Sequence, residues 1–415
     1  MSAYRGTLPR LASAVLGQGG ISLSNLLIGV LLARALTPFD YGSYVLGLSI
    51  ALLAMGIQDS LVCIPATVRM GRFPVSRKRR HFSRIKKFAH SVGLGAACIG
   101  AVVGSIGLVA TGRSSDINMV LAVSAAGFGW VTWDFARAEG YAISNIRQVA
   151  SADTAYLAIT IISVSALYIT GHLTSWIVLC IMGLAGTVAA VVAIGDDEFF
   201  ESRWQRIRRI GSGLWIRGRW SFVASQATCV QSEGYIYVTT LMLSRETLAT
   251  LAAARMLVAP LLTVLTAWNK AMLPRLSEAG PEVRSRLVGQ STAAFLLLVF
   301  VWEMLVLLAQ NFLSQRVFLG KYPQIGNLSI FWSVVVAAGG FRSICLTAAR
   351  ASGMFVPLAR IAIVGAFATV VLCTIGVAAF GAQGALIALG AIELASGFLI
   401  LNLIRRFVRE KTKQP

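Results

Sequence analysis

Charged residues are scarce in this sequence of 415 residues, because Asp, Glu, Lys and Arg together make up 13% of it. A soluble domain carries roughly a quarter. Acidic residues are the scarcest of these, with 17 Asp and Glu against 37 Lys and Arg, whereas hydrophobic residues make up 56%. This composition excludes a water-soluble globular protein, a disordered chain and a cytosolic enzyme. It predicts an integral membrane protein.

Motifs for metal, disulfide and nucleotide chemistry are also missing. The six cysteines include no CxxC pair and have no His at ligand spacing, so neither a disulfide framework nor a zinc site is supported. The sequence contains no G-x4-G-K-[ST] loop for ATP and no Ser-His-Asp or paired-carboxylate motif. We therefore expect no cofactor and no metal, and a protein that is not an enzyme.

Twelve stretches are apolar over the roughly 20 residues that a helix needs to cross a membrane, and they predict an all-α integral membrane fold. They lie near residues 11–36, 44–65, 88–110, 117–136, 151–170, 174–194, 216–243, 248–273, 288–309, 327–349, 356–379 and 383–404. The first stretch is too long and too polar for a cleavable signal peptide, so it is predicted to be the first membrane helix.

The distribution of Lys and Arg predicts the orientation of these spans. Most of the 37 lie in one set of alternate loops, and the other set holds only Arg113, Arg245, Arg316 and Lys321. By the positive-inside rule both termini are cytoplasmic, and the net charge of +20 then reflects topology, not a nucleic-acid partner. The opposite loops are short, the longest covering about 310–326, and they leave no room for an external catalytic domain.

Two patterns recur about half a chain length apart. The pattern A-R-A-x-G-x6-R occurs at residues 136–147 and 349–360, and a weaker echo relates residues 36–42 to 243–249. We predict two parallel six-helix halves, residues 1–200 and 201–415, around a central cleft. Such symmetry is typical of transporters that move a substrate by rocking one half against the other.

Residues 31–44, LLARALTPFDYGSY, resemble the L-A-R-x-L-x-P-x-[DE]-[YF]-G-x-[YF] signature of bacterial polysaccharide export proteins. Shorter matches follow in order at residues 253–260, 272–277 and 318–322, which resemble an A-x-R-x-x-x-P helix, an L-P-x-L-S end and an F-G-x-x-Y loop. These proteins are Wzx-type flippases of the MOP superfamily, which also contains multidrug and toxic compound extruders (MATE) and lipid II flippases.

The resemblance implies a MOP/MATE-like fold in the bacterial inner membrane. It implies that undecaprenyl-diphosphate-linked oligosaccharide repeat units are translocated by alternating access for exopolysaccharide, capsule or O-antigen synthesis. Implied partners are this substrate, membrane lipids, H+ or Na+, and a polysaccharide polymerase or chain-length regulator. Two alternatives stay open: a cation-coupled multidrug extruder, expected to have a more acidic and aromatic cleft, and a polytopic enzyme of polysaccharide assembly.

Cationic residues inside the predicted spans are the candidate substrate site. A charge at the bilayer centre costs about 3 kcal/mol, so each needs a partner or a wet cavity. The five are Arg34, Arg255, Lys270, Arg342 and Arg360. Guanidinium groups can bind a diphosphate bidentately, and we select Arg34, Arg255, Lys270 and Arg342. The alternatives are a bond from Arg34 to the loop of Asp40, snorkelling of Lys270, and structural ion pairs.

Acidic residues in the spans are candidates for binding a coupling ion. We select Asp59 and Glu233, which the resemblance implies lie on cleft helices, and pairing with an Arg is the alternative. Glu393 is predicted to be structural, against Arg342 or Arg360. Asp134, beside Trp130 and Trp133, is predicted to be an interfacial anchor. The basic residues between 77 and 87 are predicted to determine topology, with binding of anionic lipid or of the diphosphate as alternatives.

Overall fold

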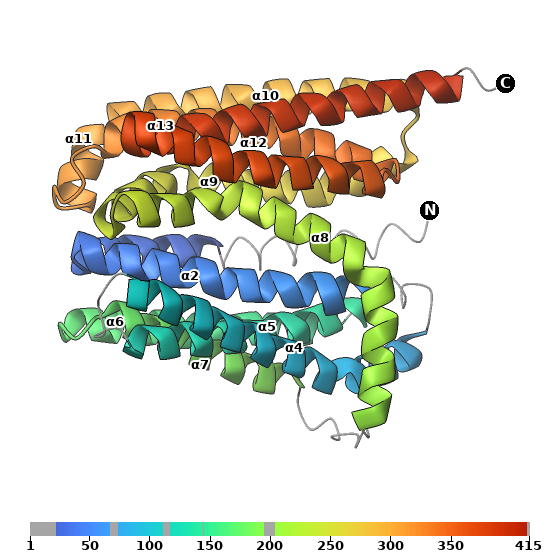
Figure 1. Ribbon diagram of the computed structural model, residues 1–415, viewed down its shortest axis with the longest axis horizontal. Helices are drawn as coiled ribbons and strands as arrows, with labels where there is room; N and C mark the ends of the chain where they lie inside the picture. The colour runs from blue at the N-terminus through green and yellow to red at the C-terminus, as the bar shows by residue number, and fades with distance from the viewer. Residues whose placement is uncertain (1–21, 67–73, 111–116, 144, 195–203, 413–415) are drawn as a thin grey trace. The chain divides into compact units, whose positions relative to one another are not determined.

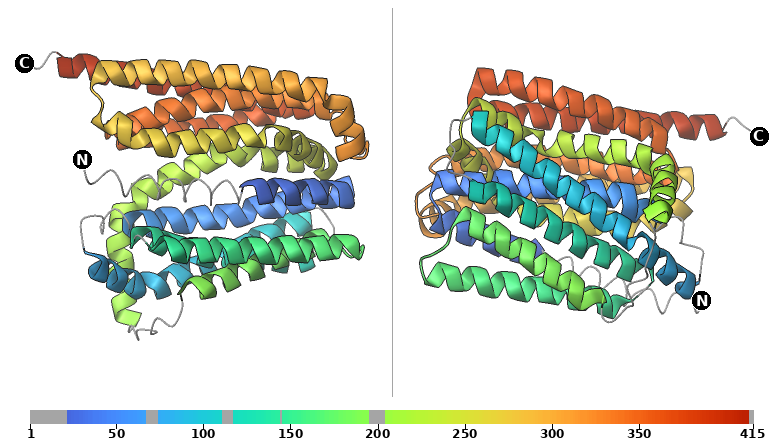
Figure 2. Two further views of the ribbon diagram at one scale, coloured as in Figure 1. Left: turned by 180° about the vertical axis from the view of Figure 1, so that it is seen from behind. Right: turned by 60° about the horizontal axis from the view of Figure 1, so that its bottom comes forward.

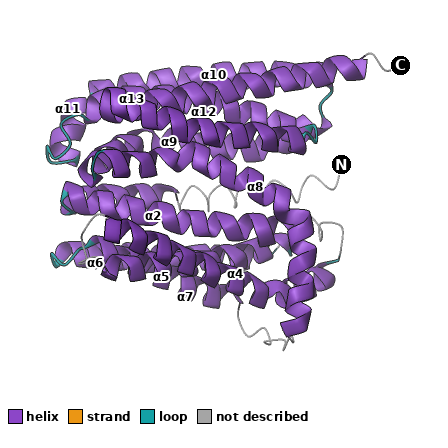
Figure 3. Cartoon of the chain, in the orientation of Figure 1, coloured by secondary structure: helices purple, strands orange, loops and turns teal. Residues whose placement is uncertain are grey.

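The computed structural model describes residues 22–66, 74–110, 117–143, 145–194 and 204–412. Within these ranges the chain is helical, joined by turns, and contains no strand (Figure 3). It divides into two compact units, Met1–Gln226 (unit 1) and Ala227–Pro415 (unit 2). The division falls inside helix α8 (Trp204–Met242), so this helix contributes residues to both units.

Unit 1 contains the first six of the predicted spans. A helix over Ser22–Ala35 is followed by α2 (Pro38–Gln58) with its π-helical continuation η2 (Asp59–Cys63), α4 (Val75–Ala110), α5 (Ile117–Ala142), α6 (Ile146–Ile169) and α7 (Ser175–Ile194). Helix α5 packs against α2, α4, α6 and α7 (Figures 1 and 2). Helix α5 is therefore the central helix among those described in this unit.

Unit 2 contains the last six spans. Its helices are α8 (Trp204–Met242), α9 (Arg245–Glu278), α10 (Pro281–Leu308), the short α11 (Gln310–Phe312) with η4 (Leu313–Val317), α12 (Ile325–Ala351) and α13 (Phe355–Thr412). Helix α12 packs against α9, α10 and α13. The chain reverses within α13 at Phe380 and Gly381, whose φ of 59° suits glycine, so α13 is a helical hairpin that contains the last two predicted spans.

The prediction of an all-α membrane fold is confirmed. Each of the twelve predicted spans falls on a helix, although residues 11–21 lie outside the described part of the chain. Among the described residues, eight helices are long and apolar enough to cross a membrane. The chain is therefore a multi-pass membrane protein.

The recurring sequence patterns fall on equivalent places of the two units. Thr37 caps α2 by accepting a hydrogen bond of 3.1 Å from the backbone N–H of Asp40, and Ser244 caps α9 by accepting one of 3.1 Å from Thr247 N–H. Each cap begins the second helix of its unit. The A-R-A-x-G pattern lies at the end of α5 in unit 1 and of α12 in unit 2, and these are the central helices.

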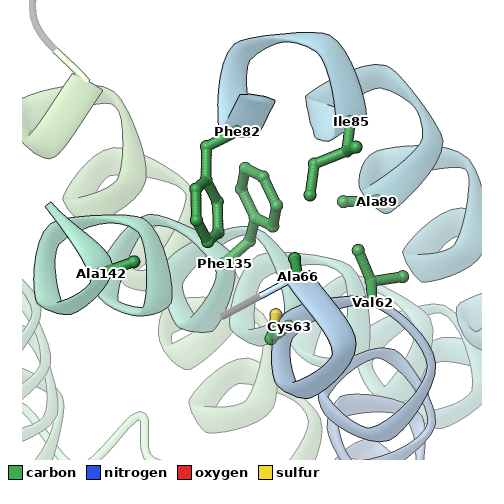
Figure 4. Packing of buried hydrophobic residues seen from close by; sticks show 8 residues of the cluster. All are labelled: Val62, Cys63, Ala66, Phe82, Ile85, Ala89, Phe135 and Ala142. Atoms are coloured by element: carbon green, nitrogen blue, oxygen red, sulfur yellow. The ribbon is translucent and has the colours of Figure 1, made fainter. Parts of the chain in front are cut away.

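The basic segment between residues 75 and 87, which precedes the predicted span 88–110, is helical. It forms the first turns of α4, because Phe82, Ile85 and Ala89 are fully buried on one face of that helix. They pack against Val62 of η2 and Phe135 of α5 (Figure 4). The mean hydropathy of this segment is low because of its charges. Its apolar residues are nevertheless spaced so that they share one face of a helix.

Helices α5 and α7 approach each other through glycines. A Cβ atom on Gly183 of α7 would clash with the backbone oxygen of Ala125, and one on Gly129 of α5 would clash with the oxygen of Gly183. A Cβ on Gly186 would lie 2.6 Å from Gly129 O. Backbones this close leave no room for a side chain, as is common between membrane helices.

Arg284 of α10 joins three segments at one end of unit 2. Its Nε donates to the carbonyl of Leu276 at 2.9 Å and its Nη2 to that of Ala279 at 3.0 Å, at the end of α9. Its Nη1 donates to Ser352 Oγ at 2.5 Å, just after α12. The guanidinium thus satisfies carbonyls that the helix end leaves without partners.

We expect Arg284→Ala to destabilise unit 2 by about 2 kcal/mol, because part-buried hydrogen bonds from a charged group contribute roughly 1.5–3 kcal/mol. Thermal unfolding of the purified protein in detergent would measure this as a lower Tm. Arg286→Ala is the matched control, since Arg286 is exposed on the same helix. Equal Tm values for the two variants would contradict the expectation.

Candidate functional site

Arg255 and Glu233, both selected from the sequence, lie together in unit 2. Arg255 of α9 donates to both carboxylate oxygens of Glu233 on α8, from Nη1 to Oε2 at 2.6 Å and from Nη2 to Oε1 at 2.6 Å. The side chains retain 31% and 22% exposure, respectively. The pair is therefore a bidentate ion pair that a ligand can still reach.

Two aromatic residues frame this ion pair. Nη1 of Arg255 also donates to the hydroxyl of Tyr235 at 3.2 Å, and its guanidinium carbon lies 5.4 Å from the ring centroid of Trp332 on α12. The two rings meet edge to face at 5.3 Å. Trp332 is fixed by a 2.9 Å bond from Nε1 to Leu251 O. Arg255 is thus held in position by a carboxylate, a phenol and a cation–π contact.

Arg342 lies in a second ion pair of unit 2, with Glu393 of α13. Of the two partners predicted for Glu393, Arg342 and Arg360, the structure pairs it with Arg342. Gln231 of α8 donates from Nε2 to Glu393 Oε1 at 3.4 Å and to Ser396 Oγ at 3.2 Å. Only 12% of the Arg342 side chain and 5% of the Glu393 side chain are exposed. This pair is therefore more enclosed than that of Arg255.

Helix α8 thus contacts the rest of unit 2 through polar side chains at alternate positions. Gln231 reaches α13, Glu233 reaches α9, and Tyr235 meets α9 and α12. Thr369 of α13 adds a 3.4 Å bond to the backbone carbonyl of Gln231. Helix α8 is therefore joined to α9, α12 and α13 by hydrogen bonds, an ion pair and a ring contact.

Asp59 lies in an acidic cluster of unit 1. One ligand atom each from Asp59, Cys63 and Asp134 lies within 4.8 Å of the others. Asp59 begins the π-helical turn η2, a feature that often marks functional sites. Asp134 lies 3.9 Å from Arg137 Nη1, and Arg137 Nε is 2.9 Å from Asp153. Two carboxylates, those of Asp134 and Asp153, therefore contact the guanidinium of Arg137, and Asp59 lies beside Asp134.

Asp134 is predicted to be an interfacial anchor beside Trp130 and Trp133, and the structure places both tryptophans in the interior of the unit. Both are buried within unit 1, with exposures of 6% and 5%. The ring of Trp133 stacks on Tyr156 at 4.2 Å, and Trp130 Nε1 donates to the Tyr156 hydroxyl at 3.1 Å. Through these two contacts the tryptophans of α5 pack against α6.

For Arg34 and Lys270, the other two cations predicted to bind the substrate, the structure gives fewer contacts. Arg34 is half-buried on the Ser22–Ala35 helix of unit 1. Lys270 belongs to α9, but its side chain lies outside what the structure describes. Its neighbour Asn269 donates to Ser343 Oγ at 2.8 Å and accepts from Thr347 at 2.8 Å. This end of α9 is thereby bound to α12.

Several residues around these groups gave no signal in the sequence. Tyr235 and Trp332 read as ordinary apolar residues of spans, and Gln231 and Asp153 as isolated polar ones. The sequence spacing between Arg255 and Trp332 carries no information about their proximity, because they lie on different helices.

Comparison with known proteins shows which solved structures share this fold. No family model and no curated protein sequence matches the chain. Solved structures do match: an inward-facing multidrug resistance MATE family transporter of the MOP superfamily, with a TM-score of 0.64, 13% identity and coverage of 97% of this chain and 100% of that one. A mutant of the Vibrio cholerae MATE transporter VcmN matches with a TM-score of 0.63 and 15% identity, covering 99% and 98%.

The lipid II flippase MurJ, in an inward closed conformation, also matches. Its TM-score is 0.76 at 10% identity, and the match covers 95% of this chain and 87% of that one. The chain therefore has the fold shared by MATE transporters and this flippase. The predicted MOP/MATE-like architecture is confirmed at the level of the fold.

Proposed function

We propose that this protein is a flippase that translocates an undecaprenyl-diphosphate-linked oligosaccharide across the bacterial inner membrane by alternating access. The fold, the multi-pass helices and the resemblance of residues 31–44 to polysaccharide export proteins support the proposal. The observation that carries it is the partly exposed guanidinium of Arg255, because a fixed planar cation matches the oxygens of a diphosphate.

The bidentate contact with Glu233 indicates how Arg255 would bind such a substrate. The two carboxylate oxygens at 2.6 Å take the positions that two phosphate oxygens would take. We infer that the diphosphate displaces Glu233 and that Tyr235 and Trp332 keep the guanidinium in place. The displaced Glu233 is then free to bind a proton, which makes it a candidate for coupling.

The other residues selected from the sequence remain part of the proposal in subordinate roles. We propose that Arg34 and Lys270 provide further positive charge for the diphosphate, and that Arg342 contributes only when its contact with Glu393 opens. Asp59, with Asp134 beside it, is the coupling candidate of unit 1. A polymerase or chain-length regulator would receive the product.

A multidrug extruder is the second candidate, and one observation favours it. Tyr235 and Trp332 place aromatic rings beside the ion pair of Glu233, and rings next to a carboxylate are the chemistry that attracts an organic cation. Against it, Arg255 occupies this carboxylate at both oxygens. A cationic drug would have to displace the guanidinium from Glu233, whereas an anionic substrate would bind to that guanidinium.

We expect deletion of the gene to abolish a surface polysaccharide and to leave lipid-linked repeat units on the cytoplasmic leaflet. Extraction and chromatography of the lipid-linked intermediates, with and without a complementing copy, would measure this. Unchanged polysaccharide together with greater sensitivity to cationic drugs would contradict the flippase and support the extruder. Loss of the polymer without accumulation of lipid-linked units would indicate an enzyme of its assembly.

A further inference from the structure

The first turns of α4 carry three basic residues that the proposed substrate site does not use. Arg80, Arg84 and Lys87 follow one another at intervals of four and then three residues, so they share one face of the helix. Arg80 and Arg84 are exposed, and Lys87 is partly exposed. We call these three residues the basic face of α4.

The opposite face of the same turns fixes the direction of the basic face. Phe82, Ile85 and Ala89 are fully buried on that opposite face. They pack against Val62 of η2 and Phe135 of α5 (Figure 4). Rotating this part of α4 would expose its apolar residues to water, which is costly. The basic face is therefore held pointing away from the core of unit 1.

The charge of the basic face is not balanced by a carboxylate in the described part of the chain. Helix α4 contains no acidic residue. Within the described ranges, no Asp or Glu forms an ion pair with Arg80, Arg84 or Lys87. Three positive charges on one helix face are therefore available to an anion from outside the chain.

Further along α4 the same side of the helix becomes apolar while it stays exposed. Leu94 lies seven residues, or about two turns, after Lys87 and thus on the same side. Leu94, Ile99 and Val102 are exposed by 56%, 60% and 58%, respectively. They belong to the predicted span 88–110, and exposed apolar residues of a membrane helix face the lipid chains. The basic face therefore begins where the lipid chains end.

The rise of the helix sets the depth of each basic residue. At 1.5 Å per residue, Lys87 lies about 10 Å and Arg84 about 15 Å from Leu94 along the helix axis. The polar headgroups add roughly 5–8 Å on each side of the hydrocarbon, and long basic side chains bend towards this interface. Lys87 and Arg84 are therefore closest to the lipid phosphates, and Arg80, about 20 Å from Leu94, is farther out.

We propose that the basic face of α4 binds the phosphate groups of anionic phospholipids. The phosphate contacts Arg84 and Lys87, and the acyl chains of the same lipid lie along Leu94, Ile99 and Val102. Guanidinium and ammonium groups both bind phosphate oxygens. A phospholipid matches both parts of this surface, whereas an acidic protein or a nucleic acid would match only its charge. The bound lipid holds this end of unit 1 at the membrane surface, whatever substrate the protein transports.

Native mass spectrometry of the purified, delipidated full-length protein tests the proposal. Phosphatidylglycerol and phosphatidylcholine with the same acyl chains are the two probes. We expect the wild type to bind phosphatidylglycerol more tightly. Combining Arg80→Gln, Arg84→Gln and Lys87→Gln should lower that affinity at least roughly tenfold, because each basic residue near the surface contributes about fivefold. The affinity for phosphatidylcholine should not change.

The matched control combines Arg286→Gln, Arg405→Gln and Arg406→Gln, which removes three exposed charges from unit 2. It should bind phosphatidylglycerol as the wild type does. An equal loss in this control would overturn the proposal, because net charge would then explain the preference.

Single variants test the depth of the site and avoid the removal of three charges at once. Lys87→Gln should weaken binding of phosphatidylglycerol more than Arg80→Gln does, and both should retain the wild-type Tm because neither side chain is buried. Undecaprenyl diphosphate is the third probe. Unchanged phosphatidylglycerol affinity in all these α4 variants would overturn the proposal. So would loss of undecaprenyl diphosphate binding alone, which would assign the basic face to the substrate.

Discussion

Arg255→Ala is expected to lower export of the lipid-linked oligosaccharide roughly tenfold to a hundredfold while the protein still accumulates in the membrane. Hydrogen bonds from a charged group contribute about 1.5–3 kcal/mol. We therefore expect the loss of the contacts between Arg255 and the diphosphate to weaken substrate binding by about 2 kcal/mol, and each 1.4 kcal/mol corresponds to a factor of ten. The measurement is the rate at which labelled lipid-linked repeat units reach the outer leaflet of reconstituted vesicles.

Charge alone does not explain the expected loss. Arg316→Ala removes one positive charge from an exposed position of the same unit, and we expect it to export normally. Arg255→Lys keeps the charge but cannot contact two oxygens in the plane of a guanidinium, so an intermediate rate is expected. Wild-type export by Arg255→Ala would exclude Arg255 from the substrate site.

A structural role for the pair is distinguished by removing both charges. In Arg255→Gln with Glu233→Gln no ion is left without a partner, so the protein should be as stable as wild type or nearly so. If the pair only stabilises unit 2, this double variant should also export normally. If Arg255 binds the diphosphate, export should stay as low as in Arg255→Ala.

Gly183→Val is expected to prevent stable folding of unit 1. The new Cβ atom would clash with the backbone oxygen of Ala125 on α5, and a backbone atom cannot move aside as a flexible side chain can. Helices α5 and α7 would have to separate, and we expect a cost of roughly 3 kcal/mol or more. Membrane accumulation and the Tm in detergent measure the effect.

Gly95→Val is the matched control in the same unit, because no atom lies within 4 Å of a Cβ atom at that position of α4. This variant should accumulate normally and retain its Tm. Normal accumulation of Gly183→Val would show that α5 and α7 do not pack as closely as the structure has them.

The sequence predicted the helices well because their signal is local. A run of about 20 apolar residues forms a helix in a membrane whatever surrounds it, since the backbone has no other hydrogen-bond partners there. The helix between residues 75 and 87 was not predicted, because it depends on contacts that are not local. Its buried residues Phe82, Ile85 and Ala89 pack against Val62 and Phe135 of other helices. The burial of Trp130 and Trp133 was not predictable for the same reason, because their partner Tyr156 lies on another helix.

The amino-acid sequence by itself determined the all-helical membrane architecture and which charges require an explanation. The tertiary structure decided which charges meet. It placed Arg255 with Glu233, Arg342 with Glu393 and Asp59 with Asp134. Hydropathy is summed along the chain, whereas an ion pair depends on distances of a few ångströms between helices.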